Sequence, residues 1–312
     1  MSAAKRLVVA INPSASFGKG RDVGPAVVSA LRALGHEVTS LQEPDFEQLM
    51  TVARVAVAAV PDAFVVVGGD GMVNLGVNLL AGTGVPLAIV PTGTGNDMAR
   101  GLGIPHDDPS AAIGALLRAL DQPARVIDAG RMEYLDDRTG RPAVRRFASV
   151  VSAGFDSVVN ERANRMTRPK GASRYTIALI LELVALKPIP YRLVLDGVDL
   201  RTEALLVTVG NNVSIGGGMK VTPDALVDDG LFDVLVVRPL PRLSFIRIFP
   251  RVFKGTHVTD PRVTIHRVAT IRIESEVAIA YADGERIGAL PIDITVEPGA
   301  LLVLGSEVKG AS

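Results

Sequence analysis

Over roughly the first 125 residues, short β-branched runs alternate with longer segments rich in Ala and Leu. Most of the short runs are apolar throughout, which is typical of strands buried on both faces, and the longer segments have helical composition. We expect strands at residues 7–11, 37–41, 63–67 and 87–90. We expect helices at residues 24–34, 46–59, 73–80, 96–102 and 111–120. This alternation predicts an α/β domain, spanning residues 1–126, in which helices cover both faces of a parallel sheet.

The pattern changes after residue 126, where short apolar runs are separated by turn sequences such as Asp196-Gly197 and Asp283-Gly284. Such spacing predicts antiparallel strands. These runs occupy residues 146–151, 191–195, 204–209, 231–237, 263–265 and 270–273. Two helical stretches, at residues 156–166 and 175–186, interrupt them. We therefore expect a β-rich, sandwich-like second domain over residues 127–298.

Composition excludes several classes of protein. The chain has no Cys, which rules out disulfides, thiolate zinc sites and cysteine nucleophiles. Its 33 basic residues balance 33 acidic ones, aromatic residues make up 4%, and Trp is absent. Binding to nucleic acid depends on excess positive charge and on aromatic stacking, so we expect no nucleic-acid partner.

No stretch of the sequence is long and apolar enough to predict a membrane span, which needs about 20 apolar residues. The best candidate, at residues 175–186, is short and contains Glu182. The apolar run near the N-terminus leads into Asn12-Pro13 and not into a cleavage site for a signal peptide. We expect a cytoplasmic protein that meets a membrane only at its inner face.

Two glycine-rich sequences follow consecutive predicted strands, GGDG at residues 68–71 and PTGTGND at residues 91–97. Ligands of parallel sheets bind at the carboxyl ends of strands, and exposed backbone at a helix N-terminus suits phosphate groups. Each sequence also supplies a carboxylate, Asp70 or Asp97. Asp70 would orient a magnesium ion or accept a proton, and the alternative for either loop is a capped strand-to-helix turn. Neither loop matches a P-loop or a dinucleotide fingerprint.

These sequences resemble the diacylglycerol kinase catalytic-domain family, which includes bacterial diacylglycerol kinases and sphingosine kinases. The family's G-G-D-G-T-x-N-E and P-x-G-T-x-N-D-x-A-R stand here as GGDGMVNL and PTGTGNDMAR. Similar segments continue at residues 152–165, 210–234 and 282–285, so the resemblance covers essentially the whole chain. Two positions depart from the pattern: Met72 replaces a Thr, and Leu75 replaces a Glu.

The resemblance implies an ATP-dependent lipid kinase that phosphorylates the hydroxyl of diacylglycerol to give phosphatidic acid. Glu285 would be the general base, with Asp70 as the acid beside the phosphates and Asp97 in support. The nucleotide would contact Asn12, Gly68, Gly69, Asp70, Gly71, Asn74, Gly93 and Thr94. A Mg²⁺ ion would bind the Asp229 carboxylate and the carbonyls of Leu226 and Leu231. A tail strand near residues 299–308 would return to the first domain.

Other interpretations remain open from the residues alone. Residues 283–285 also fit a charged hairpin turn, and residues 228–230 a plain turn. Kinases of another lipid alcohol or a sphingoid base are alternatives, and Met72 and Leu75 motivate a non-catalytic nucleotide or lipid sensor. NAD kinases share the GGDG sequence, but the second half of this chain does not follow their pattern.

Residues 238–254 contain five basic residues and no acidic one. A cationic amphipathic segment of this kind can rest on anionic headgroups, as can a second basic cluster. The apolar face would comprise Phe245, Ile246, Phe249, Val252 and Phe253. The second cluster comprises Arg162, Arg165, Arg168, Lys170 and Arg174. The alternative is that the phenylalanines pack inside the second domain. A homodimer is compatible with the sequence.

Overall fold

The computed structural model describes residues 3–12, 22–154, 159 and 187–305. Its contacts divide the chain into two units, one of Met1–Ala129 with Pro298–Ser312 and one of Gly130–Glu297. The predicted helices at residues 156–166 and 175–186, and the basic cluster at residues 162–174, lie outside the described residues apart from position 159.

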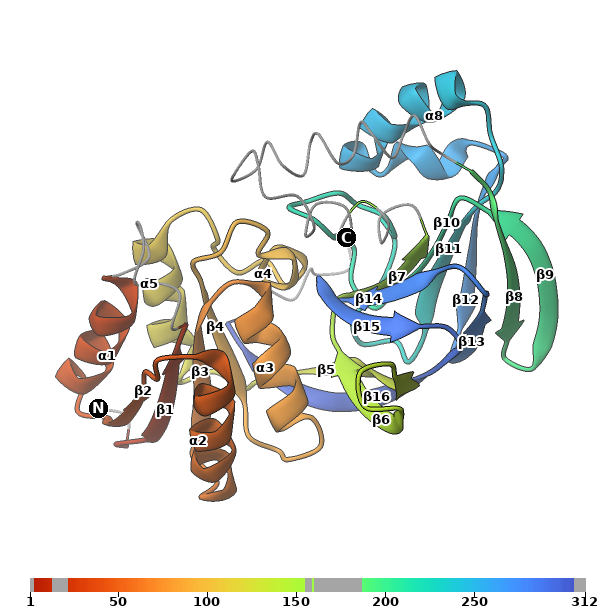
Figure 1. The fold of residues 1–312 in the computed structure, drawn as a ribbon. Helices are drawn as coiled ribbons and strands as arrows, with labels where there is room; N and C mark the ends of the chain where they lie inside the picture. The colour runs from red at the N-terminus through yellow and green to blue at the C-terminus, as the bar shows by residue number, and fades with distance from the viewer. Residues whose placement is uncertain (1–2, 13–21, 155–158, 160–186, 306–312) are drawn as a thin grey trace. The chain divides into compact units, whose positions relative to one another are not determined.

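The first unit is built on a parallel sheet with strand order β2-β1-β3-β4. Its strands are β1 (Arg6–Ile11), β2 (Glu37–Leu41), β3 (Ala63–Gly68) and β4 (Leu87–Pro91). Its helices are α1 (Val23–Ala33), α2 (Phe46–Ala58), α3 (Asp70–Leu80), α4 (Asp97–Gly101) and α5 (Pro109–Ala119). The last residues of β16 (Ile292–Leu304) pair with β4 in the same parallel sense (Figure 1).

Helices cover both faces of this sheet, as the sequence predicts. Leu31 of α1 and Leu116 of α5 share a buried cluster with Val65 of β3. On the opposite face, Gly76 of α3 lies against the side chains of Val66 and Leu87. Successive strand residues point to opposite faces, so two covered faces require strands that are apolar at every position.

The second unit contains antiparallel sheets around a shared apolar core, which confirms the predicted β-rich, sandwich-like architecture. One sheet has the order β12-β11-β10-β7-β14-β15, and the other contains β16-β13-β8-β9 together with β5 and β6. The first comprises β12 (Val263–Val268), β11 (Phe232–Val237), β10 (Leu206–Gly210), β7 (Val150–Gly154), β14 (Ile279–Ala282) and β15 (Glu285–Ala289). The second adds β13 (Thr270–Glu274), β8 (Ile189–Leu195), β9 (Val198–Ala204), β5 (Arg125–Asp136) and β6 (Arg141–Phe147).

Inside the core of the second unit, the rings of Phe147 and Phe232 stack with their centroids 5.7 Å apart. Both side chains are fully buried, and they join Val207 of β10 and Ile271 of β13 in one cluster. Aromatic rings stacked in this way add to the stabilisation that burial of their area provides.

Two of the differences from the predicted element boundaries bear on the candidate site. Helix α3 begins at Asp70 and not at Val73, with Gly69 in an extended conformation before it. The predicted strand at residues 146–151 is broken into β6 and β7, because Ala148 and Ser149 donate their backbone N–H groups to the Asp283 carboxylate. The break between β6 and β7 therefore comes from a contact between residues distant in sequence, whereas the early start of α3 lies in a glycine-rich sequence that is not typical of a helix.

A short helical segment follows β11 and packs on the outer face of its sheet. It consists of α8 (Arg242–Ile248) and two 3₁₀ turns, η2 (Phe249–Lys254) and η3 (Thr256–Thr259). Phe245 and Val252 from this segment share a buried cluster with Leu235 and Val237 of β11. The phenylalanines of the segment therefore contribute in part to the core of the second unit.

Candidate functional site

The two glycine-rich loops of the first unit pack backbone against backbone. Thr92 donates its N–H to the carbonyl of Gly68 at 2.9 Å. A Cβ placed on Gly93 would lie 2.5 Å from the Cα of Gly69, closer than any side chain tolerates. Glycine is needed at Gly93 because the loops approach so closely, in addition to any role in exposing backbone to a phosphate.

The Asp70 carboxylate joins these loops. Its Oδ2 accepts the backbone N–H of Asn96 at 3.0 Å, and its Oδ1 accepts the backbone N–H of Asp97 at 2.8 Å. The first N–H groups of a helix have no partner within the helix, so Asp70 satisfies the beginning of α4 from another part of the chain. The alternative interpretation predicted that each loop caps its own helix, but the N-cap residues Gly69 and Asn96 make no side-chain cap hydrogen bond. Asp70 instead caps α4 from the other loop.

Asn96 shapes the second loop between β4 and α4. It adopts a left-handed backbone conformation with φ 51°, which Asn tolerates better than most residues. Its Oδ1 accepts the N–H of Gly93 at 3.0 Å, and its Nδ2 donates to the Gly93 carbonyl at 2.9 Å. This side chain closes the loop into a compact turn.

Asp70 and Asp97 come together beside Gly95. A Cβ on Gly95 would lie 2.5 Å from Oδ2 of Asp70 and 3.2 Å from Oδ2 of Asp97. Asp97 is buried and Asp70 is half-buried, and each is the first residue of a helix. Helix N-termini favour negative charge, which helps the site to accommodate two carboxylates close together.

The other residues predicted to bind nucleotide lie on or near the same loops. Gly93 and Thr94 are exposed, and the Asn12 backbone N–H donates to the Val67 carbonyl at 3.0 Å. Asn74 is buried in α3, where its Oδ1 accepts from Asn78 at 3.2 Å. Contact between these residues and a nucleotide stays a prediction.

The two departures from the family pattern are both core residues. Met72 and Leu75 are 2% and 4% exposed, and Met72 packs on the backbone of Gly68. Their side chains therefore support the loop and α3 from within the first unit.

Glu285 stands in the second unit as the first residue of β15, and its side chain is exposed. The preceding turn is held by Asp283, whose carboxylate accepts the backbone N–H groups of Ala148, Ser149 and Val150 at 3.0–3.1 Å. Sequence reasoning treated Asp283 only as a turn residue. Its donors are more than 130 residues away along the chain, so no local signal identifies this role.

The side chains at the predicted magnesium site already have partners. Oδ1 of Asp229 accepts the Leu231 N–H at 3.0 Å, and Oδ2 accepts from the Arg267 guanidinium. Burial raises the pKa of nearby Asp233, while Arg267 opposes that rise. No three His, Asp or Glu side chains in the described ranges are placed to hold a metal ion. Arg267 stands where a cation on Asp229 would bind, so these side chains, as they lie, do not fit Mg²⁺.

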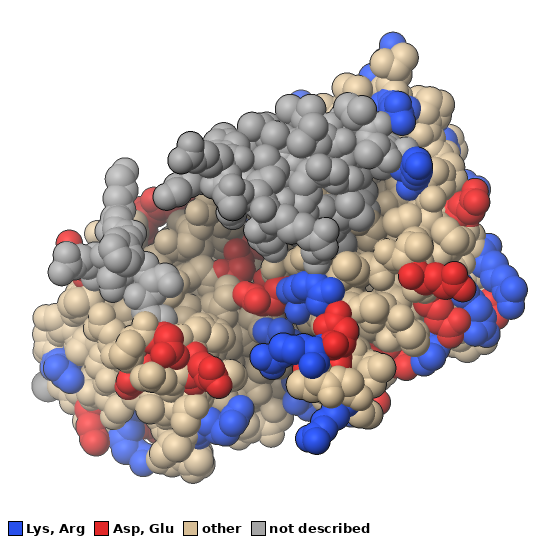
Figure 2. Space-filling model, in the orientation of Figure 1, with Lys and Arg blue, Asp and Glu red and all other residues tan. Residues whose placement is uncertain are grey.

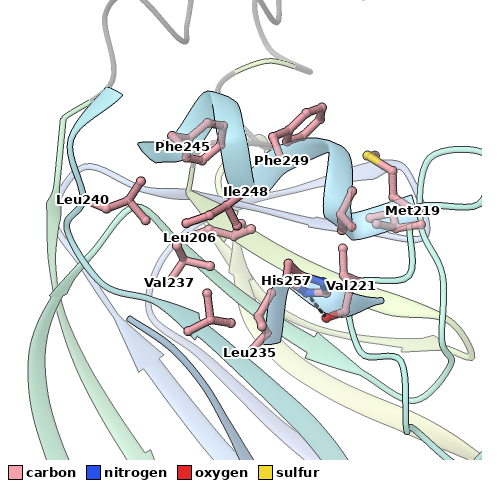
Figure 3. A pocket seen from close by; sticks show the side chains of 13 residues that line it. Leu206, Met219, Val221, Leu235, Val237, Leu240, Phe245, Ile248, Phe249 and His257 are labelled. Atoms are coloured by element: carbon pink, nitrogen blue, oxygen red, sulfur yellow. Dashed lines mark hydrogen bonds between the residues drawn. The ribbon is translucent and has the colours of Figure 1, made fainter. Parts of the chain in front are cut away.

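An apolar cavity of about 80 Å³ lies beneath α8 and η2 in the second unit (Figure 3). Its floor includes Leu206, Leu235 and Val237, and its roof includes Phe245 and Phe249. Sequence reasoning did not predict this cavity, because its lining residues are spread from residue 206 to residue 263 and converge only in the fold.

Among the described residues that line this cavity, His257 is the one strongly polar side chain. It is 4% exposed, and its Nε2 lies 3.1 Å from the carbonyl of Val221. A carbonyl only accepts, so Nε2 carries the hydrogen. Burial lowers the pKa of His257, which favours the neutral ring, and Nδ1 is then an acceptor. That Nδ1 atom is buried with no hydrogen-bond partner among the described residues.

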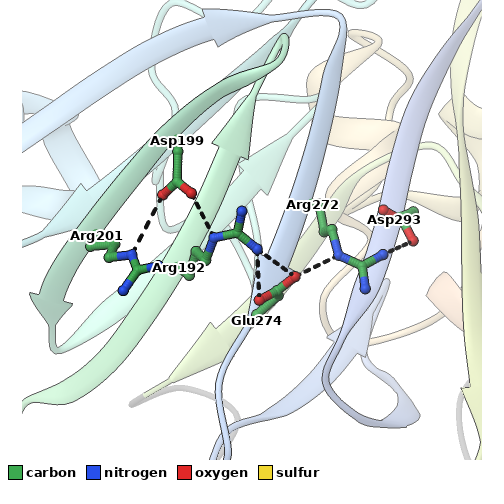
Figure 4. A network of polar contacts seen from close by, with 6 residues as sticks. All are labelled: Arg192, Asp199, Arg201, Arg272, Glu274 and Asp293. Carbon is green, nitrogen blue, oxygen red and sulfur yellow. Dashed lines mark hydrogen bonds and ion pairs between the residues drawn. The ribbon is translucent and has the colours of Figure 1, made fainter.

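A second, wider groove of about 1010 Å³ crosses the strands of the other sheet. Its guanidinium groups are already paired in a network of carboxylates (Figure 4). Glu274 accepts from Arg192 at 3.2 Å and from Arg272 at 2.7 Å, while Arg192 also binds Asp199 at 2.6 Å. Exposed ion pairs of this kind contribute little to stability, and we assign no ligand to this groove.

Comparison with known proteins shows which family this chain belongs to. Residues 6–132 match the family model of the diacylglycerol kinase catalytic domain, and residues 149–305 match the YegS C-terminal NAD kinase beta sandwich-like domain. A protein of Mycobacterium tuberculosis named diacylglycerol kinase is 38% identical over 94% of this chain and 93% of its own length. The chain belongs to the diacylglycerol kinase family. The resemblance read from the loop sequences is thereby confirmed.

Solved structures share the fold of this family member. The crystal structure of a putative diacylglycerol kinase from Bacillus anthracis str. Sterne superposes with a TM-score of 0.76, at 22% identity, covering 97% of this chain and 96% of that one. An NAD kinase from Archaeoglobus fulgidus, solved in complex with ATP, gives a TM-score of 0.54 at 17% identity, covering 97% and 94%.

Proposed function

We propose that the protein transfers the γ-phosphate of ATP to the hydroxyl of diacylglycerol, giving phosphatidic acid and ADP. The observation that carries this proposal is the carboxylate bridge from Asp70 to the backbone of Asn96 and Asp97. It holds two glycine-rich loops together where β3 and β4 end, which is the edge at which parallel sheets bind ligands. The name of the mycobacterial relative supports the lipid acceptor, and the ATP bound in the archaeal NAD kinase structure supports the donor.

In this proposal the first unit binds and orients the triphosphate. Backbone N–H groups of residues 68–71, of Thr94 and of Gly95, together with the N-terminus of α3, face the phosphate oxygens. The N–H groups of Gly93, Asn96 and Asp97 instead hold the loops in place. Asp70 and Asn96 act as positioning residues that keep both loops in one arrangement. Phosphoryl transfer depends mainly on such positioning and on stabilisation of charge.

Glu285 takes the proton of the lipid hydroxyl in this proposal. The freed oxygen forms a bond to the γ-phosphorus, the bond from that phosphorus to the bridging oxygen of ADP breaks, and ADP leaves with the electron pair. Asp283 positions Glu285 through the three backbone N–H groups that it accepts.

The apolar cavity supports a substrate with hydrocarbon chains. An apolar cavity of ~150 Å³ holds a molecule the size of benzene. The cavity beneath α8 has about 80 Å³ and therefore suits a short part of one chain. Its unpartnered His257 Nδ1 would accept a hydrogen bond from a hydroxyl or a water molecule.

An assay with radiolabelled ATP and a panel of acceptors tests the function. The panel contains diacylglycerol, a sphingoid base and a polyisoprenoid alcohol in mixed micelles, and ADP release is measured alongside labelled lipid. We expect labelled phosphatidic acid with diacylglycerol, and none with E285Q. A larger product with another acceptor would reassign the substrate, while ATP binding with no ADP release for any lipid would indicate a sensor.

A further inference from the structure

The segment of α8 and η2 has two faces of different character. Phe245 and Val252 point inward, at 8% and 7% exposure. Leu243, Ile246 and Phe253 are instead 72%, 50% and 52% exposed. The single apolar face predicted from the sequence is therefore wrong, because its residues divide between the protein core and solvent.

The outward face combines its apolar side chains with positive charge. Residues three and four apart on a helix share a side, which places Ile246 and Arg247 beside Leu243. Arg242, Arg247 and Lys254 are exposed, and within the described part of the chain no carboxylate pairs with them. Figure 2 shows Lys and Arg atoms among uncharged ones at the end of the molecule that carries α8 in Figure 1.

The two other basic residues of the stretch 238–254 donate to nearby backbone carbonyls. Arg238 donates to the carbonyl of Pro261 at 2.5 Å, and Arg251 donates to the carbonyl of Thr256 at 2.5 Å. Residues 238–254 carry five basic residues without an acid, whereas the whole chain has equal numbers of each sign. This stretch is therefore locally positive.

Single exposed apolar residues are common on protein surfaces and need no ligand. Three within eleven residues, interleaved with cations, match the chemistry of a bilayer interface, where phosphates lie directly above hydrocarbon. None of the helices that the structure describes is long and apolar enough to cross a membrane, so contact through α8 would be at the surface.

We propose that the segment of α8 and η2 docks on a bilayer that contains anionic lipid. Leu243, Ile246 and Phe253 enter the region between headgroups and acyl chains, and Arg242, Arg247 and Lys254 contact the headgroup phosphates. The proposal concerns a surface and does not depend on which acceptor the protein phosphorylates. Docking would also set the roof of the apolar cavity, formed by Phe245 and Phe249, beside lipid.

A tryptophan placed on this face reports insertion directly, because the chain contains no Trp. We expect the emission of L243W to shift to shorter wavelength on addition of vesicles of phosphatidylcholine with phosphatidylglycerol, and much less with phosphatidylcholine alone. V55W is the matched control, since Val55 is 71% exposed on α2 in the first unit. An unchanged L243W spectrum with anionic vesicles, or an equal shift in V55W, would overturn the proposal.

Vesicle sedimentation measures separately how much the basic and the apolar side chains contribute to membrane binding. Each basic residue near an anionic surface contributes about fivefold to partitioning, so R242Q/R247Q/K254Q should bind anionic vesicles about a hundredfold more weakly. L243S/I246S/F253S should lose binding as well, and R54E/V55S should bind like the wild type. Thermal unfolding of every variant confirms that it is folded. Docking would be contradicted if R242Q/R247Q/K254Q and L243S/I246S/F253S both bound vesicles as the wild type does. It would also be contradicted if the emission of L243W shifted with protein concentration in the absence of vesicles, because such a shift indicates contact between copies of the chain.

Kinase assays on the same variants keep docking and function apart. A water-soluble short-chain diacylglycerol should be phosphorylated equally by all of them, and only phosphorylation of vesicle-borne substrate should fall. If the wild type phosphorylated the soluble acceptor but did not bind vesicles, docking would be refuted and the proposed function would stand. Vesicle binding without phosphorylation of any acceptor would refute the proposed function alone.

Discussion

Oδ1 of Asp70 accepts the backbone N–H of Asp97 at 2.8 Å, so the acid of the first glycine-rich loop sets the start of the helix after the second. The two carboxylates are 27 residues apart in sequence and share the surroundings of Gly95. A single side chain therefore couples the geometry of both loops.

Removal of the Asp70 carboxylate should cost both stability and activity. In D70A the N–H groups of Asn96 and Asp97 lose a charged acceptor, so the free energy of unfolding should fall by about 1–3 kcal/mol. ATP binding and phosphatidate formation should both be lost. D70N keeps one oxygen and should lose less stability. Chemical denaturation and nucleotide titration provide the measurements, and unchanged phosphatidate formation in D70A would refute the role of Asp70.

Gly93→Ala should separate the two loops. The added Cβ would meet the backbone of Gly69, and overpacking of this kind costs about 1–3 kcal/mol. We expect a lower melting temperature and weakened ATP binding. G114A is the control, because its Cβ would meet only the end of the flexible Arg118 side chain within α5, where Ala is favoured over Gly. Equal behaviour of the two variants would show that the loops tolerate separation.

Substitution of Asp283 should lower stability, whereas substitution of Glu285, two residues away, should abolish turnover and leave stability almost unchanged. D283A removes a charged acceptor from three backbone N–H groups, so we expect the free energy of unfolding to fall by about 2–4 kcal/mol. D283N, which keeps one oxygen and tolerates a positive φ, should lose less. E285Q alters an exposed side chain and should change stability by less than about 0.5 kcal/mol while abolishing turnover. Full activity in E285Q would exclude Glu285 as the base.

The buried His257 should make stability depend on pH. Burial lowers its pKa below the ordinary 6.5, so below pH 6.5 the unfolded chain binds a proton that the folded chain does not. The free energy of unfolding should therefore fall as the pH drops from 7.5 to 5.5, by up to about 1.4 kcal/mol per pH unit from this group. H257Q should lack that contribution. Denaturation curves at pH 7.5, 6.5 and 5.5 measure the difference, and parallel pH profiles for the two proteins would contradict it.

Much of the first unit follows from local pattern. Strands β3 and β4 are apolar and fully buried because helices cover both faces, whereas the edge strand β2 is largely polar and exposed. The segments predicted at residues 37–41 and 63–67 lie within strands of the structure. The glycine-rich loops follow β3 and β4, so the edge that carries Asp70 and Asp97 was also predictable. The start of α3 at Asp70 was not predictable, because the glycine-rich sequence of its first turn is not typical of a helix.

The sequence by itself determined the two-part architecture, the family and the pair of acid-bearing loops, because these depend on periodicity and on residues close together in the chain. Only the tertiary structure decided what each acid contacts. Asp70 accepts N–H groups at the start of α4, Asp283 accepts three N–H groups where the chain passes from β6 into β7, and Asp229 accepts from the Arg267 guanidinium. The tertiary structure also divided the apolar residues of α8 between a cavity and an exposed face. Hydrogen bonds and packing join residues that are distant in sequence, and no local pattern records such pairings.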